Sequence, residues 1–176
     1  RETGTLDNSP TMIRYSVDCD CESIAALFTA SVHQIAARSY SPEQLAAWTP
    51  EPPDLEHWQA RLAGLETLLA EVEGEMAGFI CFTGSGHIEM LFTAPSFSRR
   101  GVASRLYKAA VSKMLASGVT ELSTEASIEA RPFFESKGFK IAEVQVVERS
   151  SVRLKRFLMT AHCEGPGDRP DEEHAA

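Results

Sequence analysis

Residues 98–104 read Ser98-Arg99-Arg100-Gly101-Val102-Ala103-Ser104, and this stretch decides how the chain is expected to fold. After it, apolar residues recur in four-residue steps at Val102, Leu106, Ala110 and Met114, the spacing of one helix face. Before it, residues 87–93 form an apolar segment typical of a strand. The pattern predicts a strand that leads into a helix beginning at Gly101. Because the first amides of a helix have no internal partner and lie at the positive end of its dipole, this turn is predicted to bind an anion such as a pyrophosphate.

The local charge also favours an anion site. The whole chain has a net charge of -8, whereas residues 97–118 contain no Asp or Glu and carry Arg99, Arg100, Arg105, Lys108 and Lys113. The simpler interpretation of these basic residues is that they form the solvated face of an amphipathic helix. Binding of a nucleoside triphosphate or a dinucleotide at Gly101 is disfavoured, because the sequence contains neither G-x-x-x-x-G-K-[ST] nor a complete G-x-G-x-x-G fingerprint.

Two motifs in this order resemble those of one family. Residues 98–103 are similar to the motif Q/R-x-x-G-x-G/A of the GNAT acetyltransferases, with Ser98 in place of the initial Gln or Arg. Residues 127–139 resemble the later motif N-x-x-A-x-x-x-Y-E-x-x-G-F, with Ser127 replacing Asn and Phe134 replacing Tyr. The resemblance covers about residues 12–160. It implies an α/β (α+β) fold of the GNAT type: a mixed, twisted central sheet of about six to seven strands flanked by helices, in which a splayed parallel strand pair holds coenzyme A.

Local patterns predict the other elements. Strands are expected at 13–17, 67–73, 76–83, 87–93, 121–126 and 141–147, and helices at about 20–35, 42–48, 55–65 and 132–137. Ser41 and Gln44 have the spacing of a capping box around Pro42. The strands from 67 to 93 are expected to be antiparallel, and the crossover through the helix after Gly101 should make 87–93 and 121–126 parallel.

The resemblance implies a set of contacts to the coenzyme. Main-chain amides of the turn would hold its pyrophosphate, and main-chain groups of two strand residues would pair with the pantetheine and the thioester carbonyl. A donor aimed at that oxygen would stabilise the developing oxyanion. Ser127 is expected either to contact the pantetheine or to cap a helix. The coenzyme-binding residues expected on this basis are Phe92, Thr93, Arg99, Arg100, Gly101, Val102, Ala103, Ser104, Ser127 and Phe134.

The acetyl transfer to an amine that the resemblance implies also needs a base. An alkylamine acceptor with a pKa of about 10 is mostly protonated near neutrality and must lose a proton before it attacks. Glu89 is the leading candidate, since strand alternation places it on one face with His87 and Leu91, and residues 89–92 resemble the strand that carries the catalytic glutamate in some family members. Glu89 could instead cover a sheet edge or pair with a basic residue. His87 is a second candidate, acting directly or through water.

Acetyl transfer also releases the coenzyme A thiolate, and no residue is an obvious proton donor to it. Many family members use the tyrosine of the later motif, but Phe134 has no proton to give. Tyr40, Ser127 or water could replace it, or the thiolate could leave unaided because its pKa is only about 8.5. Tyr40, Trp48 and Trp58 belong to a region that forms the acceptor wall in GNAT proteins, although aromatic residues at helical spacing usually pack in the core.

Composition limits the environment and the partners. The 176 residues fit one domain, expected at 12–161, between a tag remnant or disordered N-terminus at 1–11 and a disordered acidic tail at 162–176. Scattered histidines and four cysteines without C-x-x-C spacing argue against a metal site and favour the reducing cytoplasm. The net negative charge and the lack of a long apolar run argue against nucleic-acid or membrane binding.

Two functions are compatible with this sequence. The first is transfer of an acetyl group from acetyl-CoA to a primary amine of a small molecule or peptide, by direct attack in a ternary complex. The second is a non-catalytic acyl-CoA-binding sensor or interaction module with a GNAT fold, suggested by Phe134 and by the unidentified acceptor. Pairing of edge strands could produce a homodimer.

Overall fold

The computed structural model describes residues 9–149 and 151–165. The strands are β1 (Thr11–Tyr15), β2 (Glu66–Val72), β3 (Glu75–Phe82), β4 (His87–Thr93), β5 (Glu121–Ser127), β6 (Lys140–Arg149) and β7 (Val152–His162). The helices are α1 (Cys21–Ile35), α2 (Pro42–Trp48), α3 (Leu55–Ala63), α4 (Val102–Ala116) and α5 (Arg131–Ser136). Short 3-10 turns occur at Asp18–Asp20, Ala36–Arg38 and Pro95–Phe97.

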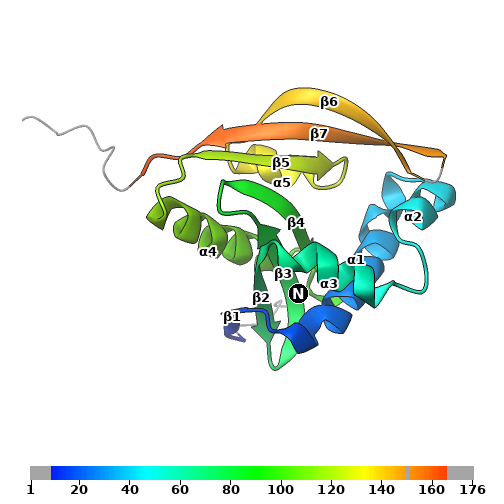
Figure 1. Ribbon diagram of the computed structural model, residues 1–176, viewed down its shortest axis with the longest axis horizontal. Helices are drawn as coiled ribbons and strands as arrows, with labels where there is room; N and C mark the ends of the chain where they lie inside the picture. The colour runs from blue at the N-terminus through cyan, green and yellow to red at the C-terminus, as the bar shows by residue number, and fades with distance from the viewer. Residues whose placement is uncertain (1–8, 150, 166–176) are drawn as a thin grey trace, which may run out of the picture.

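The strands form one seven-stranded mixed sheet in the order β1-β2-β3-β4-β5-β7-β6, which confirms the expected fold class. β1 to β4 are successively antiparallel, and β4 and β5 are parallel, as predicted from the crossover through α4. β7 was not expected from the sequence pattern. It lies between β5 and β6, so the last strand of the described residues fills the interior of this half of the sheet (Figure 1).

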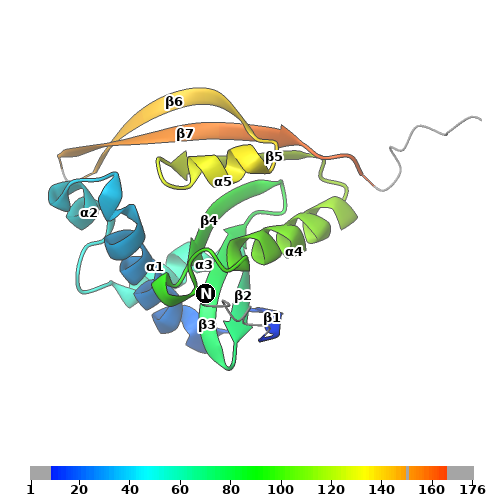
Figure 2. The ribbon, with the colours of Figure 1, turned by 180° about the vertical axis from the view of Figure 1, so that it is seen from behind.

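The sheet separates two apolar cores. α4 and α5 cover one face, where Leu106, Met114 and Phe134 pack against Ile80 and Met159. α1, α2 and α3 cover the other face, where their apolar side chains form a second cluster that includes Ile24, Phe28, Leu45, Trp58, Phe79 and Leu154. Figures 1 and 2 show these two helical layers from opposite sides. A ligand that lies between β4 and β5 can therefore be reached from two different faces.

The sheet opens between β4 and β5. These strands pair only at His87 with Ser123 and at Ile88 with Thr124. The pairing of β4 with β3 shifts at the next residue, because Phe82 lies opposite Ile88 whereas Cys81 lies opposite Met90. Glu89 is thus the extra residue of a β-bulge, which bends a strand and increases its twist. The expected splayed parallel pair is present, and the bulge marks the point where it opens.

Local capping explains where the helices begin. Ser41 Oγ accepts a hydrogen bond from the Gln44 amide, and the Gln44 side chain accepts one from the Ser41 amide, so the predicted capping box is confirmed. Asp54 caps α3 by accepting from the His57 amide. Proline stands in the first turn of α2 and of α5, where its missing N–H costs no helical hydrogen bond.

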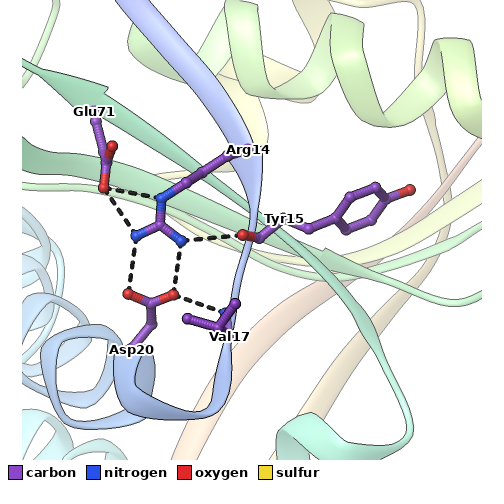
Figure 3. A network of polar contacts seen from close by, with 5 residues as sticks. All are labelled: Arg14, Tyr15, Val17, Asp20 and Glu71. Atoms are coloured by element: carbon purple, nitrogen blue, oxygen red, sulfur yellow. Dashed lines mark hydrogen bonds and ion pairs between the residues drawn. The ribbon is translucent and has the colours of Figure 1, made fainter.

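A charged cluster fixes the first strand to the first helix (Figure 3). The guanidinium of Arg14 donates to both carboxylate oxygens of Asp20, at 2.8 and 3.0 Å, and to Glu71 on β2 at 2.9 Å. Asp20 also accepts from the Val17 amide at 2.8 Å. The hydrogen bond from Arg14 lowers the pKa of the Asp20 carboxyl, and the same contacts raise the pKa of Arg14. This cluster holds the turn from which α1 begins.

The boundaries expected for the termini are tested only in part. Residues 1–8 and 166–176 lie outside the described residues, so the expectations of disorder there stay predictions. β1 begins at Thr11 and β7 ends at His162, each one residue beyond the expected domain limits of 12 and 161. Within the described part of the chain, no helix combines the length and apolar character needed to cross a membrane.

Candidate active site

The first element of the site is the turn before α4. Gly101 is the N-cap of the helix and has a left-handed backbone with φ of 80°, and Arg99 is also left-handed, with φ of 62°. The first hydrogen bond of the helix runs from the Arg105 amide to the Gly101 carbonyl. The amides of Val102, Ala103 and Ser104 come before it, so they have no acceptor within the helix. A Cβ built on Gly101 would meet no atom within 4 Å, so the turn is open to a ligand.

The basic residues around this turn have different roles. Arg105 donates to Thr11, and the Lys113 ammonium lies 4.4 Å from the Tyr15 ring, so both hold β1 against α4. Arg100 lies over the Phe97 ring at 5.0 Å. Sequence reasoning missed Lys137, which follows α5 and donates to Ser104 Oγ at 3.1 Å. Its position one residue before Gly138, at the end of the second motif, was the available signal.

The second element is the open edge of β4. Ala94 donates to the Ala77 carbonyl, and hydrogen-bonded pairs alternate along an antiparallel ladder, so the pair Phe92 and Phe79 is also hydrogen-bonded. The main-chain groups of Phe92 therefore point toward β3, whereas those of Leu91 and Thr93 point toward the gap. The contact that the resemblance assigned to Phe92 is thus available to Leu91 instead. Ser31 of α1, which the sequence did not single out, donates to the Thr93 carbonyl and anchors this end of the strand.

The third element is a cavity of about 150 Å³ on the face of the sheet covered by α1, α2 and α3. Its walls come from α1 to α3 on one side and from β4, β5, β6 and β7 on the other. The lining residues include Glu89, His87, Tyr40, Phe92, Ser127 and Phe134, so the cavity brings together all three predicted catalytic residues with part of the coenzyme set. The cavity lies where β4 and β5 separate.

Glu89 and His87 form a pair at this opening. His87 Nε2 lies 3.4 Å from Glu89 Oε2, and His87 Nδ1 lies 2.8 Å from the hydroxyl of Ser123 on β5. The Glu89 side chain is 38% exposed and that of His87 is 27% exposed, so solvent reaches both. The bulge explains the position of Glu89, because the extra residue turns its side chain to the cavity just where the β4 edge becomes open. A carboxylate and an imidazole in contact can pass a proton between a bound amine and water.

Tyr40 has a structural role in addition to lining the cavity. Its hydroxyl donates to the Lys155 carbonyl of β7 at 3.2 Å and accepts from the Ile128 amide at 2.8 Å. Burial raises the pKa of Tyr40. The side chain thus joins the end of β5 to β7, and its proton is directed toward a main-chain carbonyl. These contacts make Tyr40 a weaker candidate for the proton donor than its sequence position suggested.

The later motif forms the turn after β5 and the helix α5. Ser127 Oγ accepts from the Ala130 amide at 3.2 Å and so closes the turn before α5, whose N-cap is Ala130 without a side-chain hydrogen bond. Phe134 is 3% exposed and packs edge-on against Phe133 and Phe139, which makes it part of the core as well as a wall of the cavity. Gly138 has the expected left-handed backbone, with φ of 89°.

The three aromatic residues of the helical region are divided between core and cavity. Trp58 is 6% exposed and belongs to the core of the α1–α3 face. Tyr40 and Trp48 line the cavity and stack edge-on at 5.3 Å, next to Phe28 and Phe92. One wall of the cavity is therefore aromatic. Among residues 9–149 and 151–165, no three His, Cys, Asp or Glu side chains gather as a metal site would require.

A parallel strand pair that opens at a bulge, with a helix N-terminus on one face and a cavity containing Glu89 on the other, is the arrangement of an acetyltransferase of the GNAT class. Residues 36–157 match the family described as Acetyltransferase (GNAT) domain. The chain is also 36% identical over 140 residues to the uncharacterized N-acetyltransferase YafP of Escherichia coli (strain K12), covering 80% of this chain and 88% of that protein. The chain therefore belongs to the GNAT acetyltransferase family.

Solved structures share this fold. A GCN5-related N-acetyltransferase from Rhodopseudomonas palustris superposes with a TM-score of 0.83 and 32% identity, covering 88% of this chain and 96% of that one. The PaiA N-acetyltransferase of Thermoplasma acidophilum, solved with coenzyme A, gives a TM-score of 0.69 at 19% identity, with 87% and 99% covered. YncA of Salmonella typhimurium, solved with acetyl-CoA, gives 0.65 at 17% identity, with 93% and 99% covered.

Proposed function

We propose that the protein transfers an acetyl group from acetyl-CoA to a primary amine by direct attack in a ternary complex. The observation that carries this proposal is the position of Glu89 at the bulge where β4 separates from β5. There, the Glu89 carboxylate faces the cavity while main-chain groups of Leu91 and Thr93 face the gap. Family membership supports acyl transfer, and the site supports an amine that loses a proton before it attacks.

The residues present fit the coenzyme. The Val102, Ala103 and Ser104 amides would hold its pyrophosphate, since they lie in the first turn of a helix capped by a left-handed glycine. Arg99, Arg100 and Lys137 supply positive charge near this turn, and Lys137 already contacts Ser104. Leu91 and Thr93 would pair with the pantetheine through the open edge of β4. Acetyl-CoA supplies the activated acetyl group, and the protein supplies its orientation.

Glu89 is proposed as the base. Its carboxylate would take a proton from the acceptor ammonium, directly or through water, and His87 in contact with it would help to pass that proton toward Ser123 and solvent. The 38% exposure of the Glu89 side chain allows this exchange with water. Because Phe134 has no ionisable group and the Tyr40 hydroxyl is engaged, we propose that the thiolate leaves unaided or takes its proton from water.

The alternative function is a non-catalytic acyl-CoA sensor. One observation favours it: the position that matches the tyrosine of the later motif is a phenylalanine buried in the core. A sensor would bind the coenzyme and change its assembly or partner affinity without turnover. The enzyme hypothesis predicts thiol release that depends on both acetyl-CoA and an amine.

One experiment separates these functions. The protein is mixed with acetyl-CoA and a broad panel of primary amines, free thiol is followed with time, and coenzyme A binding is measured by calorimetry. Amine-dependent thiol release supports the enzyme. Coenzyme binding without turnover across the panel, together with a ligand-dependent change in mass by light scattering, supports the sensor. Absence of coenzyme binding would overturn both.

We also propose that the protein acts in the reducing cytoplasm and could pair through its edge strand. Cys19, Cys21, Cys81 and Cys163 are free thiols, which suits that compartment. β6 is an edge strand on which Val144 and Val146 are about half exposed, at 54% and 52%. Light scattering over a range of protein concentrations would test for a homodimer.

A further inference from the structure

The cavity beside Glu89 is positively charged within a protein of net charge -8. Among its lining residues, Arg61, Arg149, Lys155 and Arg156 are basic, whereas Glu89 and Glu125 are acidic. Arg156 is used internally, because its guanidinium binds Glu125 at 2.8 Å and Gln145 at 2.8 Å. The Lys155 ammonium lies over the Phe157 ring, whose side chain belongs to the core on the opposite face. Arg61 and Arg149 are the two cations left facing the cavity.

These two arginines come from opposite walls. Arg61 lies on α3, is half-buried, and stacks over Trp58 and Phe28 with its guanidinium carbon 5.4 and 6.0 Å from their rings. Arg149 is the last residue of β6 and is exposed at the cavity. Burial lowers the pKa of Arg61, Glu89 raises it, and the positive charge of Arg149 lowers it again. Both side chains line the same cavity, so one anion bound there could contact both guanidinium groups.

Glu89 does not replace such an anion. Among the described residues, no ion pair joins Glu89 to either arginine, and the contact of its carboxylate is with His87 Nε2 at 3.4 Å. The Arg61 guanidinium lies over two aromatic rings, and its planar group can bind a carboxylate or a phosphoryl group through two hydrogen bonds. The aromatic wall of Phe28, Trp48 and Phe92 lies beside it.

We propose that the amine acceptor is itself an anion: a small amine that carries a carboxylate or phosphoryl group, which binds between Arg61 and Arg149 while its amine faces Glu89. This inference rests on the proposed acetyl transfer and names the substrate class of the same site. An α-amino acid or a short aminoalkyl phosphonate has the required pair of groups. A plain alkylamine or polyamine would bring a further positive charge to a cavity in which basic residues already outnumber acidic ones, and would leave Arg61 and Arg149 without an anion.

The test uses matched acceptors. Thiol release is measured with acetyl-CoA and uncharged-side-chain L-amino acids, their carboxamides, aminoalkyl phosphonates and alkylamines. The anionic compounds should exceed their neutral matches in kcat/KM by about 10- to 100-fold, the range of a charge-assisted hydrogen-bond pair. Preference for carboxylate or phosphonate identifies the anion. Equal or better acetylation of carboxamides and alkylamines would overturn the inference and leave the acetyltransferase proposal intact.

Variants locate the anion site. Arg149→Met should reduce the preference for the anionic acceptor to near unity, mainly through KM, and Arg149→Lys should retain part of it. Arg153→Met is the matched control, because Arg153 lies opposite Glu148 in the same hairpin and does not line the cavity. An unchanged preference in Arg149→Met, or an equal loss in both methionine variants, would contradict the inference.

A binding measurement covers the case in which no amine is acetylated, which would count against the proposed function alone. Calorimetry with coenzyme A-loaded protein then compares N-acetyl-L-amino acids with their carboxamides. Selective binding of the carboxylates, weakened by Arg149→Met and kept by Arg153→Met, supports the anion site. Equal binding of both compounds, or of neither, overturns it.

Discussion

At the scale of single residues, the β-bulge concentrates the chemistry on Glu89. Glu89→Gln keeps the size of the side chain and removes its ability to accept a proton. We expect kcat to fall by about 10²- to 10⁴-fold, the usual contribution of a positioned acid or base, with coenzyme A affinity within a few-fold of the original. Steady-state thiol release and calorimetry measure the two effects. A similar loss in affinity and turnover would instead indicate that Glu89 supports the coenzyme site.

At the scale of the elements, the left-handed cap decides how α4 presents its amides. Gly101→Ala forces a residue with a Cβ into φ of 80°, which costs about 1–2 kcal/mol. The added methyl also points into the open space where the coenzyme is expected. We expect lower stability in urea and weaker coenzyme A binding by calorimetry. Gly64→Ala at the end of α3 is the control, because φ there is -95° and no atom lies within 4 Å of the new Cβ.

A second prediction at this scale concerns the contact between β3, β4 and α4. A Cβ on Gly78 would lie 2.8 Å from the Phe92 carbonyl oxygen, 3.0 Å from Val102 and 3.1 Å from Leu106. The carbonyl belongs to the main chain and cannot move aside alone, so Gly78→Ala should cost about 1–3 kcal/mol, the range for an overpacked core. It should also displace the open edge of β4 and weaken coenzyme A binding. Gly84→Ala, whose Cβ would meet nothing within 4 Å, should do neither.

At the scale of the whole molecule, the Arg14 cluster links the stability of the fold to pH. Arg14 lowers the pKa of Asp20 below its usual 3.8, so this carboxylate stabilises the native state above that pH and loses its effect as the pH falls through the folded-state pKa. Asp20→Asn should cost about 1.5–3 kcal/mol at pH 7 and progressively less below pH 4. Urea denaturation between pH 7 and pH 3 measures this convergence. Asp18 lies in the same turn and is exposed, so Asp18→Asn is the control: its free energy of unfolding should equal that of the original protein across this pH range.

Much of this architecture could be predicted from local sequence. The α4 turn, the Ser41 capping box, the antiparallel strands and the parallel crossover all depend on residues close together in the chain or on handedness rules. The limits of β4 agree with the expected 87–93 because turn residues bound an apolar segment there. Glu89 was found because an acid among apolar strand residues is unusual, although the sequence did not show that it forms a bulge.

The sequence alone thus determined the class of fold, the glycine turn that precedes α4 and the candidate base, since each depends on spacing within one element or between neighbouring elements. Only the tertiary structure decided which strand edge stays open, that main-chain groups of Leu91 and not Phe92 face it, and that the Tyr40 hydroxyl is engaged. It also placed Arg61 and Arg149 on the same cavity and brought Lys137 to Ser104. These features depend on the register of strand pairs and on the insertion of β7 between β5 and β6, where cooperative packing of distant segments decides the outcome and local propensity does not.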